Sequence, residues 1–120
     1  MGSLAGRRVL VVEDETLVAM LVEDTLADAG VQVLGPVATV SEALSLLESE
    51  RPDLAVLDLN LAGETSEPVA ERLMAMEVPF VVASGYGAAG LPQRLVGNPV
   101  LAKPYAPEDL TAALARLPVG

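Results

Sequence analysis

The chain has 120 residues, enough for one domain with a single hydrophobic core, and its seventeen acidic and seven basic residues give it a net charge of -10. This charge repels phosphate backbones and anionic lipid, so we expect neither nucleic acid nor a membrane as a partner. Cysteine and histidine are both absent, which excludes disulfides, the usual zinc sites and histidine-dependent nucleophilic triads.

The start of the chain has the pattern of a strand followed by a helix. Residues 9–12 form an apolar run that ends in the acids Glu13, Asp14 and Glu15, which predicts a strand with carboxylates at its carboxyl end. The apolar residues after it recur at helical spacing and predict a helix that Gly30 is placed to stop. These residues are Leu17, Val18, Leu21, Val22 and Leu26.

A second strand and helix come next. The strand is predicted over residues 31–34, where a Gly-Pro pair breaks the apolar run. Thr39 and Glu42 have the spacing of a capping box, in which a hydroxyl and a carboxylate satisfy backbone N–H groups at a helix start. The predicted helix carries Leu44 and Leu47, and a proline closes the unit.

The third apolar run, residues 54–61, contains one acid, Asp58. A run this short and this rich in Val and Leu is typical of a strand buried on both faces in the middle of a parallel sheet. The carboxyl ends of such strands face the ligand crevice, so we expect Asp58 to point at a bound group. The alternative is that Asp58 is a turn or helix-cap residue for the loop at residues 59–65.

A third helix is predicted from about Glu67, with a proline in its first turn, and residues 80–83 form a fourth strand. The apolar face of this helix consists of Val69, Leu73 and Met76. Each helix so far connects one predicted strand to the next, which is the pattern of repeated βαβ units.

The segment at residues 85–97 is rich in glycine and leaves only residues 91–96 as a short helix, so we expect a weak or mobile fourth helix. Residues 100–102 form a fifth strand, and Pro107 starts a last helix with acids in its first turn. The core face of the last helix is predicted to hold Leu110, Ala113, Leu114 and Leu117.

Strands that alternate with helices predict an α/β fold, a doubly wound parallel sheet of five strands in the order 2-1-3-4-5 with right-handed crossovers. The domain is expected at residues 8–117, between an amino-terminal tail, 1–7, and a carboxyl-terminal tail, 118–120.

No apolar run is long enough to cross a bilayer and no signal-peptide pattern is present, so we expect a cytoplasmic protein.

In this strand order the carboxyl ends of strands one, three, four and five converge and bring polar residues together. These residues are Glu13, Asp14, Asp58, Ser84 and Lys103. Carboxylates held this close repel one another, and a divalent cation with oxygen ligands, Mg²⁺ or alternatively Mn²⁺, relieves the repulsion. A hydroxyl and an ammonium opposite an acid suit a transferred phosphoryl group, for which Asp58 would be the nucleophile. Taken singly, Lys103 is also explained as a surface lysine and Ser84 as a hydroxyl bonded to backbone.

The chain resembles the receiver domains of two-component response regulators over essentially its whole length. The motifs that carry the resemblance are Val11-Val12-Glu13-Asp14-Glu15, Val56-Leu57-Asp58-Leu59 and Ala102-Lys103-Pro104. The resemblance implies a flavodoxin-like, CheY-like receiver fold in which Asp58 is the phosphoacceptor and Ser84 and Lys103 hold the phosphoryl oxygens.

The same resemblance implies how the metal is bound and which proteins the chain meets. The side chains of Asp14 and Asp58 and the backbone carbonyl of Asn60 would bind Mg²⁺, and Glu13 would reach the metal through water. A histidine kinase would donate the phosphoryl group, and a downstream protein would recognise a changed surface at residues 85–105. We expect a monomer, with a dimer as the alternative, and no enzymatic action on other substrates.

The run Val82-Ala83-Ser84-Gly85-Tyr86-Gly87 resembles the motif of the FAT GUY subgroup of single-domain response regulators. Members of this subgroup partner histidine kinases of the HWE type, often in general stress signalling. Val82, Ser84 and Gly87 depart from the Phe, Thr and Tyr of the subgroup motif, although serine keeps the hydroxyl.

Val100 stands where most receivers have an aromatic residue that swings inward on phosphorylation. Tyr86 or Tyr105 could replace it, and we favour a switch in which phosphorylation orders residues 85–97. Two other functions stay open. A pseudo-receiver would bind a protein partner without phosphorylation, and a small phosphohydrolase would need an acid where Asn60 stands and a cap domain that 120 residues cannot hold.

Overall fold

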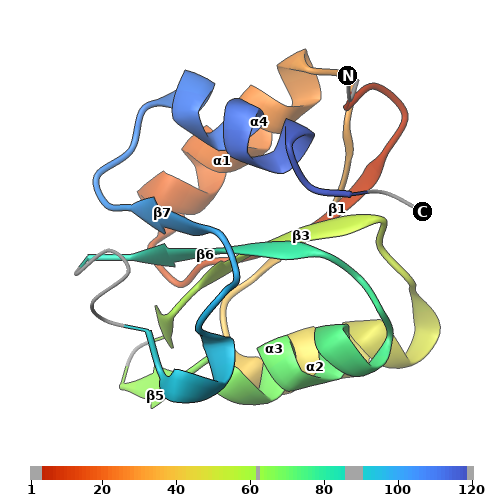
Figure 1. The fold of residues 1–120 in the computed structure, drawn as a ribbon. Coiled ribbons are helices and arrows are strands. Elements are labelled where there is room, and N and C mark those ends of the chain that lie inside the picture. Colours follow the sequence, from red (N-terminus) through yellow and green to blue (C-terminus); the bar gives the residue numbers. More distant parts are fainter. Residues whose placement is uncertain (1–3, 62, 86–90, 119–120) are drawn as a thin grey trace.

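The computed structural model describes residues 4–61, 63–85 and 91–118, and a five-stranded parallel sheet forms its middle layer (Figure 1). The strand order is β2-β1-β3-β6-β7, and every neighbouring pair is parallel. Counted along the chain, this is the predicted order 2-1-3-4-5, so the predicted fold class is confirmed. The strands are β1 (Arg8–Val12), β2 (Gln32–Val37), β3 (Leu54–Asp58), β6 (Phe80–Ser84) and β7 (Val100–Ala102).

Two helices cover each face of the sheet (Figure 1). On one face lie α1 (Thr16–Asp28) and α4 (Pro107–Ala115), and on the other lie α2 (Val40–Ser49) and α3 (Glu67–Ala75). Alternate side chains of a central strand enter opposite cores: Leu10 of β1 packs toward α2 and α3, whereas Val9 packs toward α1 and α4. All residues of β3 and β6 are buried, as expected for central parallel strands. No described helix is long and apolar enough to span a membrane.

The start of α2 confirms the Thr39 half of the predicted capping box, whereas Glu42 bonds the residue before the cap. The hydroxyl of Thr39 accepts a hydrogen bond from the backbone N–H of Glu42 at 3.1 Å, and the Glu42 carboxylate accepts one from the N–H of Ala38 at 3.0 Å. The first bond satisfies an N–H group that the helix itself leaves without a partner, and the helix buries Ala43 and Leu47.

The third strand is shorter than predicted. It ends at Asp58, and the residues after it form β4 (Asn60–Leu61), which pairs in antiparallel fashion with β5 (Glu64–Thr65). Gly63, with a φ of 93°, lies in the turn of this hairpin. Leu59 and Leu61 remain buried although they lie beyond the end of β3. The apolar run at residues 54–61 therefore indicates which residues are buried and not how far the strand extends.

The second strand is longer than predicted, because it continues through Gly35 and Pro36 to Val37. A Cβ on Gly35 would come within 2.7 Å of the Val37 nitrogen and 3.0 Å of the Val11 carbonyl oxygen, and its φ is 96°. Only glycine fits there, and the register shifts between Leu10 and Val12 of β1 at the same place. A proline is tolerated because β2 is an edge strand.

The apolar residues of α1 do not form a single buried face. Val22 and Leu26 are buried as predicted, but Leu17 and Leu21 are 82% and 55% exposed. Ala19 takes the third buried position of the helix. Five apolar residues at helical spacing exceed what one face against the sheet can bury, so the helix keeps a second apolar face toward solvent.

The predicted helix at residues 91–96 is reduced to a single 3₁₀ turn, η2 (Gln93–Leu95). Leu95 in this turn is fully buried, and Arg94 forms an ion pair with Glu71 of α3. The described part of the β6–β7 connection is therefore anchored without an α-helix, which agrees with the expectation of a weak fourth helix. Residues 86–90, including the candidate switch residue Tyr86, lie outside the described residues.

Part of the predicted amino-terminal tail packs on the domain. Leu4 is buried among the residues beneath α1 and α4, and the N–H of Gly6 donates a hydrogen bond of 2.8 Å to the carbonyl of Gly30. Residues 4–6 thus pack against the segment that follows the carboxyl end of α1. The bounds 8–117 for the domain stay a prediction.

Candidate functional site

The polar residues predicted to converge lie at the carboxyl ends of four neighbouring strands. Asp58 is the last residue of β3 and Ser84 the last residue of β6, while Lys103 directly follows β7. The sheet fixes their spacing through backbone bonds: the N–H of Lys103 donates to the carbonyl of Ser84 at 2.9 Å, and Asp58 is in register with Ala83. Their positions are therefore set by the rigid sheet.

Three carboxyl groups come together at this edge. The side chains of Glu13, Asp14 and Asp58 each offer an oxygen, and these oxygens all lie within 4.8 Å of one another. Glu13 and Asp58 are only 5% and 7% exposed, and Asp14 is half-buried. Carboxylates that are this close together and this well buried from solvent repel one another unless a cation compensates their negative charge.

Lys103 supplies part of that compensation. Its ammonium nitrogen lies 3.0 Å from Oδ2 of Asp58 and 3.2 Å from Oε1 of Glu13. Burial lowers the pKa of this ammonium, but its hydrogen bonds to Asp58 and Glu13 and their charges outweigh burial and raise the pKa above the ordinary value. The ammonium therefore stays charged at neutral pH.

The Glu13 carboxyl holds its proton more tightly than an ordinary carboxyl, chiefly because it is buried. Burial raises the pKa of the Glu13 carboxyl to about 7; the N–H of Glu15, which donates to it at 3.1 Å, lowers the pKa, and the charge of Asp58 raises it further. A second cation would offset the negative charge of the three carboxylates, two of which contact Lys103. The donor atoms are carboxylate oxygens, which Mg²⁺ prefers, so these residues fit that ion.

Ser84 and Asn60 occupy different surroundings at the same edge. Ser84 is 1% exposed, and its backbone carbonyl accepts a hydrogen bond from the N–H of Lys103. Asn60 is exposed, lies in β4 two residues beyond Asp58, and pairs with Thr65 across the hairpin. The hairpin thus fixes the Asn60 backbone two residues beyond Asp58, a feature that the sequence pattern did not predict.

The contact between Lys103 and Glu13 was also missed, because the strand pattern gives only the convergence of residues and not their pairing. Tyr105 is a second case. It packs against the core beneath α1 and α4, and burial, with a further contribution from the charge of Glu13, raises the pKa of its hydroxyl to about 12. Its position two residues after Lys103 is the only sequence signal that links Tyr105 to the site.

The model of the family described as "Response regulator receiver domain" matches residues 9–115. The chain belongs to the response regulator receiver family. The predicted family is thereby confirmed, and the phosphohydrolase alternative is not supported. Receiver domains are signalling proteins rather than classical enzymes, they bind Mg²⁺ at an acidic pocket, and they work with a histidine kinase and downstream partners.

Two solved structures show the extent of the similarity. The solution structure of SdrG from Sphingomonas melonis Fr1 is 42% identical, with 96% of this chain and 97% of SdrG covered and a TM-score of 0.80. The response regulator PhyR from Brucella abortus is 29% identical, with 95% of this chain and 48% of PhyR covered and a TM-score of 0.78.

Among curated proteins, the phyllosphere-induced regulator PhyR of Methylorubrum extorquens is 31% identical over 117 residues, which cover 90% of this chain and 42% of that protein. The transcriptional regulatory protein PdtaR of Mycobacterium tuberculosis is 29% identical over 112 residues, with 90% and 55% covered. The chain spans about half the length of these curated relatives.

Proposed function

We propose that the chain accepts a phosphoryl group on Asp58 from a histidine kinase and signals through the resulting change of surface. The observation that carries the proposal is the Lys103 ammonium, 3.0 Å from the carboxylate of Asp58 at the end of a central strand. An acid at this place is buried and oriented by the sheet. It is also paired with a cation that can form an ion pair with the oxygens of an incoming phosphoryl group.

In the proposed step, a carboxylate oxygen of Asp58 attacks the phosphorus of a phosphohistidine. A phosphorus–oxygen bond forms, the phosphorus–nitrogen bond breaks, and its electron pair stays on the ring nitrogen, which takes a proton from water to give neutral imidazole and hydroxide. Lys103 pairs with the phosphoryl oxygens, and the Ser84 hydroxyl donates a hydrogen bond to them. Hydrolysis of the acyl phosphate by water ends the signal, so no other substrate is turned over.

The side chains of Asp14 and Asp58 and the carbonyl of Asn60 are the proposed ligands of Mg²⁺, with Mn²⁺ as an alternative, and Glu13 would reach the ion through water. When bound, the ion compensates negative charge on the carboxylates and on the phosphoryl oxygens. The fit rests on the three carboxylates within 4.8 Å of one another, of which Lys103 contacts two, Glu13 and Asp58.

The likeness to SdrG and PhyR supports the FAT GUY subgroup and, with it, a histidine kinase of the HWE type as the donor. We further propose a cytoplasmic, monomeric receiver at residues 8–117. Val100, which is half-buried and in register with Val82 of β6, cannot supply an inward-swinging aromatic ring. The proposed switch is therefore an ordering of residues 85–97 when Ser84 engages the phosphoryl group, which changes the surface at residues 85–105.

Intact-mass spectrometry after incubation with acetyl phosphate and Mg²⁺ tests the proposal. The wild type should gain one phosphoryl group, only when the metal is present, and Asp58→Asn should gain none. Asp24→Asn, a matched change at an exposed aspartate of α1, should be phosphorylated as the wild type is. A phosphorylated Asp58→Asn variant would place the acceptor on another residue.

A further inference from the structure

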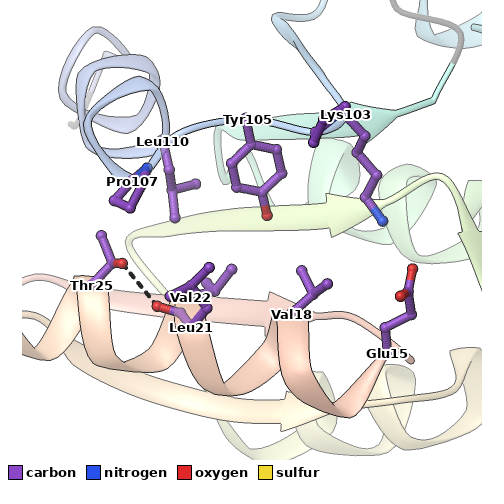
Figure 2. Close-up of a pocket in the computed structure, with 10 residues that line it drawn as sticks. Glu15, Val18, Leu21, Val22, Thr25, Lys103, Tyr105, Pro107 and Leu110 are labelled. Carbon is purple, nitrogen blue, oxygen red and sulfur yellow. Dashed lines mark hydrogen bonds between the residues drawn. The ribbon is translucent and has the colours of Figure 1, made fainter.

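Two kinds of structure hold the residues around Asp58 in place. Ser84 ends β6 and Lys103 directly follows β7, from where its side chain extends toward Glu15 at the start of α1 (Figure 2). Asn60, whose carbonyl is a proposed ligand of Mg²⁺, stands outside the five-stranded sheet on the separate β4–β5 hairpin. The position of this carbonyl therefore depends on what holds the hairpin.

The hairpin is too small to hold itself in place. Its strands have two residues each, and the N–H of Ser66 closes its base with a bond of 2.9 Å to the carbonyl of Leu59. The Ser66 hydroxyl is buried and has no hydrogen-bond partner among the described residues, so it adds nothing to this closure. A two-stranded hairpin alone is marginally stable in water. The hairpin therefore needs contacts with other elements, and Leu61, buried in the core beneath α2 and α3, supplies one of them.

The side chain of Glu64 supplies a second contact, to α2. The backbone N–H of Val40, the first residue of α2, donates a hydrogen bond of 3.1 Å to Oε1 of Glu64 in β5. The β5 strand lies on the same side of the sheet as α2 and α3 (Figure 1). The hydroxyl of Thr65 bonds only locally, to the N–H of Glu67. Among the described residues, the bond of Glu64 is therefore the side-chain hydrogen bond that ties the hairpin to an element distant in the sequence.

The start of α2 suits a carboxylate from outside the helix. The first N–H groups of a helix lack partners within it and lie at the positive end of its dipole. Thr39 satisfies the N–H of Glu42, which leaves the N–H of Val40 to an acceptor from another element. A hydrogen bond to an ionised carboxylate is stronger than one between neutral groups. Glu64 thus joins the hairpin to the helix with a charge-assisted bond.

We propose that Glu64 is a positioning residue for the metal site. Its bond to the N–H of Val40 holds the hairpin against α2 and thereby fixes the carbonyl of Asn60, which pairs across the hairpin with Thr65, the neighbour of Glu64. This role rests on the proposed function, in which the Asn60 carbonyl binds Mg²⁺. By linkage, an ion held by Asn60 also strengthens the contact between the hairpin and α2.

Calorimetric titration of the unphosphorylated protein with Mg²⁺ tests this role. Glu64→Ala should weaken binding about fivefold, less than the loss of a buried supporting residue because the bond is exposed. Glu64→Gln keeps an oxygen that can accept the bond from Val40, and its affinity should stay within about twofold of the wild type. Glu48→Ala, which removes the same charge at an exposed position of α2, should also bind as the wild type does. Equal weakening by Glu64→Gln and Glu64→Ala would show that charge alone acts, and would overturn the proposal.

The same bond can be removed from its donor. Val40→Pro deletes the N–H at the first position of a helix, where proline is favoured, and the extended backbone of Thr39, with φ −132° and ψ 160°, suits a residue before proline. This variant should also weaken Mg²⁺ binding about fivefold, whereas Val40→Ala, which keeps the N–H, should change it less than about twofold. Val40→Pro combined with Glu64→Ala should be no weaker than either alone. Effects that multiply to about 25-fold would show that the two residues act separately, against the proposal.

Amide NMR supplies a readout that a purely stabilising bond would not move. Mg²⁺ should shift the amide proton of Val40 in the wild type, and the shift should be lost in Glu64→Ala, with circular dichroism confirming the fold. If the wild type binds Mg²⁺, Asp14→Ala does not, and Glu64→Ala binds and shifts as the wild type does, only the role of Glu64 is wrong. If the wild type binds no Mg²⁺, the proposed metal ligands are wrong as well.

Discussion

Ionic clusters lie at both ends of the parallel sheet, and they differ in how far their charges are compensated. At the amino end, the N–H of Arg8 donates to Asp53 at 2.9 Å, and its guanidinium bonds the carbonyl of Arg51 at 3.2 Å and pairs with Glu50. The N–H of Asp53 in turn donates to the carbonyl of Arg8 at 2.8 Å. These contacts tie β1 to the segment before β3.

At the carboxyl end, one ammonium group pairs with two of the three clustered acids, Asp58 and Glu13, and burial raises the pKa of Glu13. The amino-terminal cluster therefore stabilises the sheet in the protein as it stands, whereas the carboxyl-terminal cluster has a surplus of negative charge that a metal ion can relieve. Charge that is poorly compensated in one state is what allows a site to respond to a cation or a phosphoryl group. The fold therefore has a cluster that stabilises the sheet at the amino ends of the strands. At their carboxyl ends it has a cluster that can respond to a cation or a phosphoryl group.

Adding metal should change stability most. If Mg²⁺ binds at the carboxyl end, it raises the free energy of unfolding by about 2.7 kcal/mol at a hundredfold excess over its dissociation constant. Asp14→Ala should abolish this gain, yet raise the melting temperature without metal, because it relieves repulsion. Thermal unfolding with and without Mg²⁺ measures both effects. A gain in Asp14→Ala equal to that of the wild type would mean that the metal binds elsewhere.

Burial of the Glu13 carboxyl should also make metal-free stability depend on pH. The Glu13 pKa is raised to about 7 from 4.5, so between these values the folded protein holds a proton that the unfolded chain has lost. The contribution of Glu13 is fully present below pH 4.5 and is lost as pH rises toward 7, at no more than about 1.4 kcal/mol per pH unit.

Urea unfolding in metal-free buffers from pH 5 to 7 measures this dependence. The fall in unfolding free energy should be reduced in Glu13→Gln, whose amide does not titrate. Glu48→Gln, at an exposed position of α2, should keep the fall seen in the wild type. Equal slopes in all three proteins would show that Glu13 is not the group that takes up the proton.

Removing the shared cation should destabilise the carboxyl end. Lys103→Ala leaves Asp58 and Glu13 without their ammonium partner and should lower the metal-free unfolding free energy by about 2 kcal/mol, less than for a fully buried pair because Glu13 can take up a proton. Chemical unfolding at pH 7 measures the change, and Arg116→Ala, at an exposed position, is the control. A loss equal to that of the control would show that the two contacts contribute nothing.

The strand ends explain how much of this site the sequence could predict. Asp58, Ser84 and Lys103 end or follow apolar runs, and a parallel sheet of known strand order brings such ends together regardless of loop detail. The identity of the site residues therefore follows from local patterns. Their pairing does not, because Lys103 reaches Glu13 through the path of its side chain after β7, which no local pattern describes.

Tertiary packing decided the features that sequence reasoning missed. Leu17 and Val22 are both apolar and both fit helical spacing, but only Val22 faces the core shared with α4. The path of β2 through Gly35 depends on the close approach of Val11 from the neighbouring strand. In each case the contacting residue that decides the structure is distant in the sequence. A local pattern therefore indicates that a residue is hydrophobic but not which way its side chain or backbone faces.

The smallest predicted effect tests the amino-terminal cluster against the carboxyl-terminal one. Asp53→Ala removes the acceptor of the Arg8 N–H and should lower the unfolding free energy by about 1 kcal/mol, with or without Mg²⁺. The sign is opposite to that expected for Asp14→Ala in metal-free buffer, although both changes delete one half-buried aspartate. Chemical unfolding of both variants, with and without metal, measures the contrast. If Asp53→Ala were stabilising, or if its effect depended on Mg²⁺, the amino-terminal cluster would carry uncompensated charge as well, and the difference between the two edges would not hold.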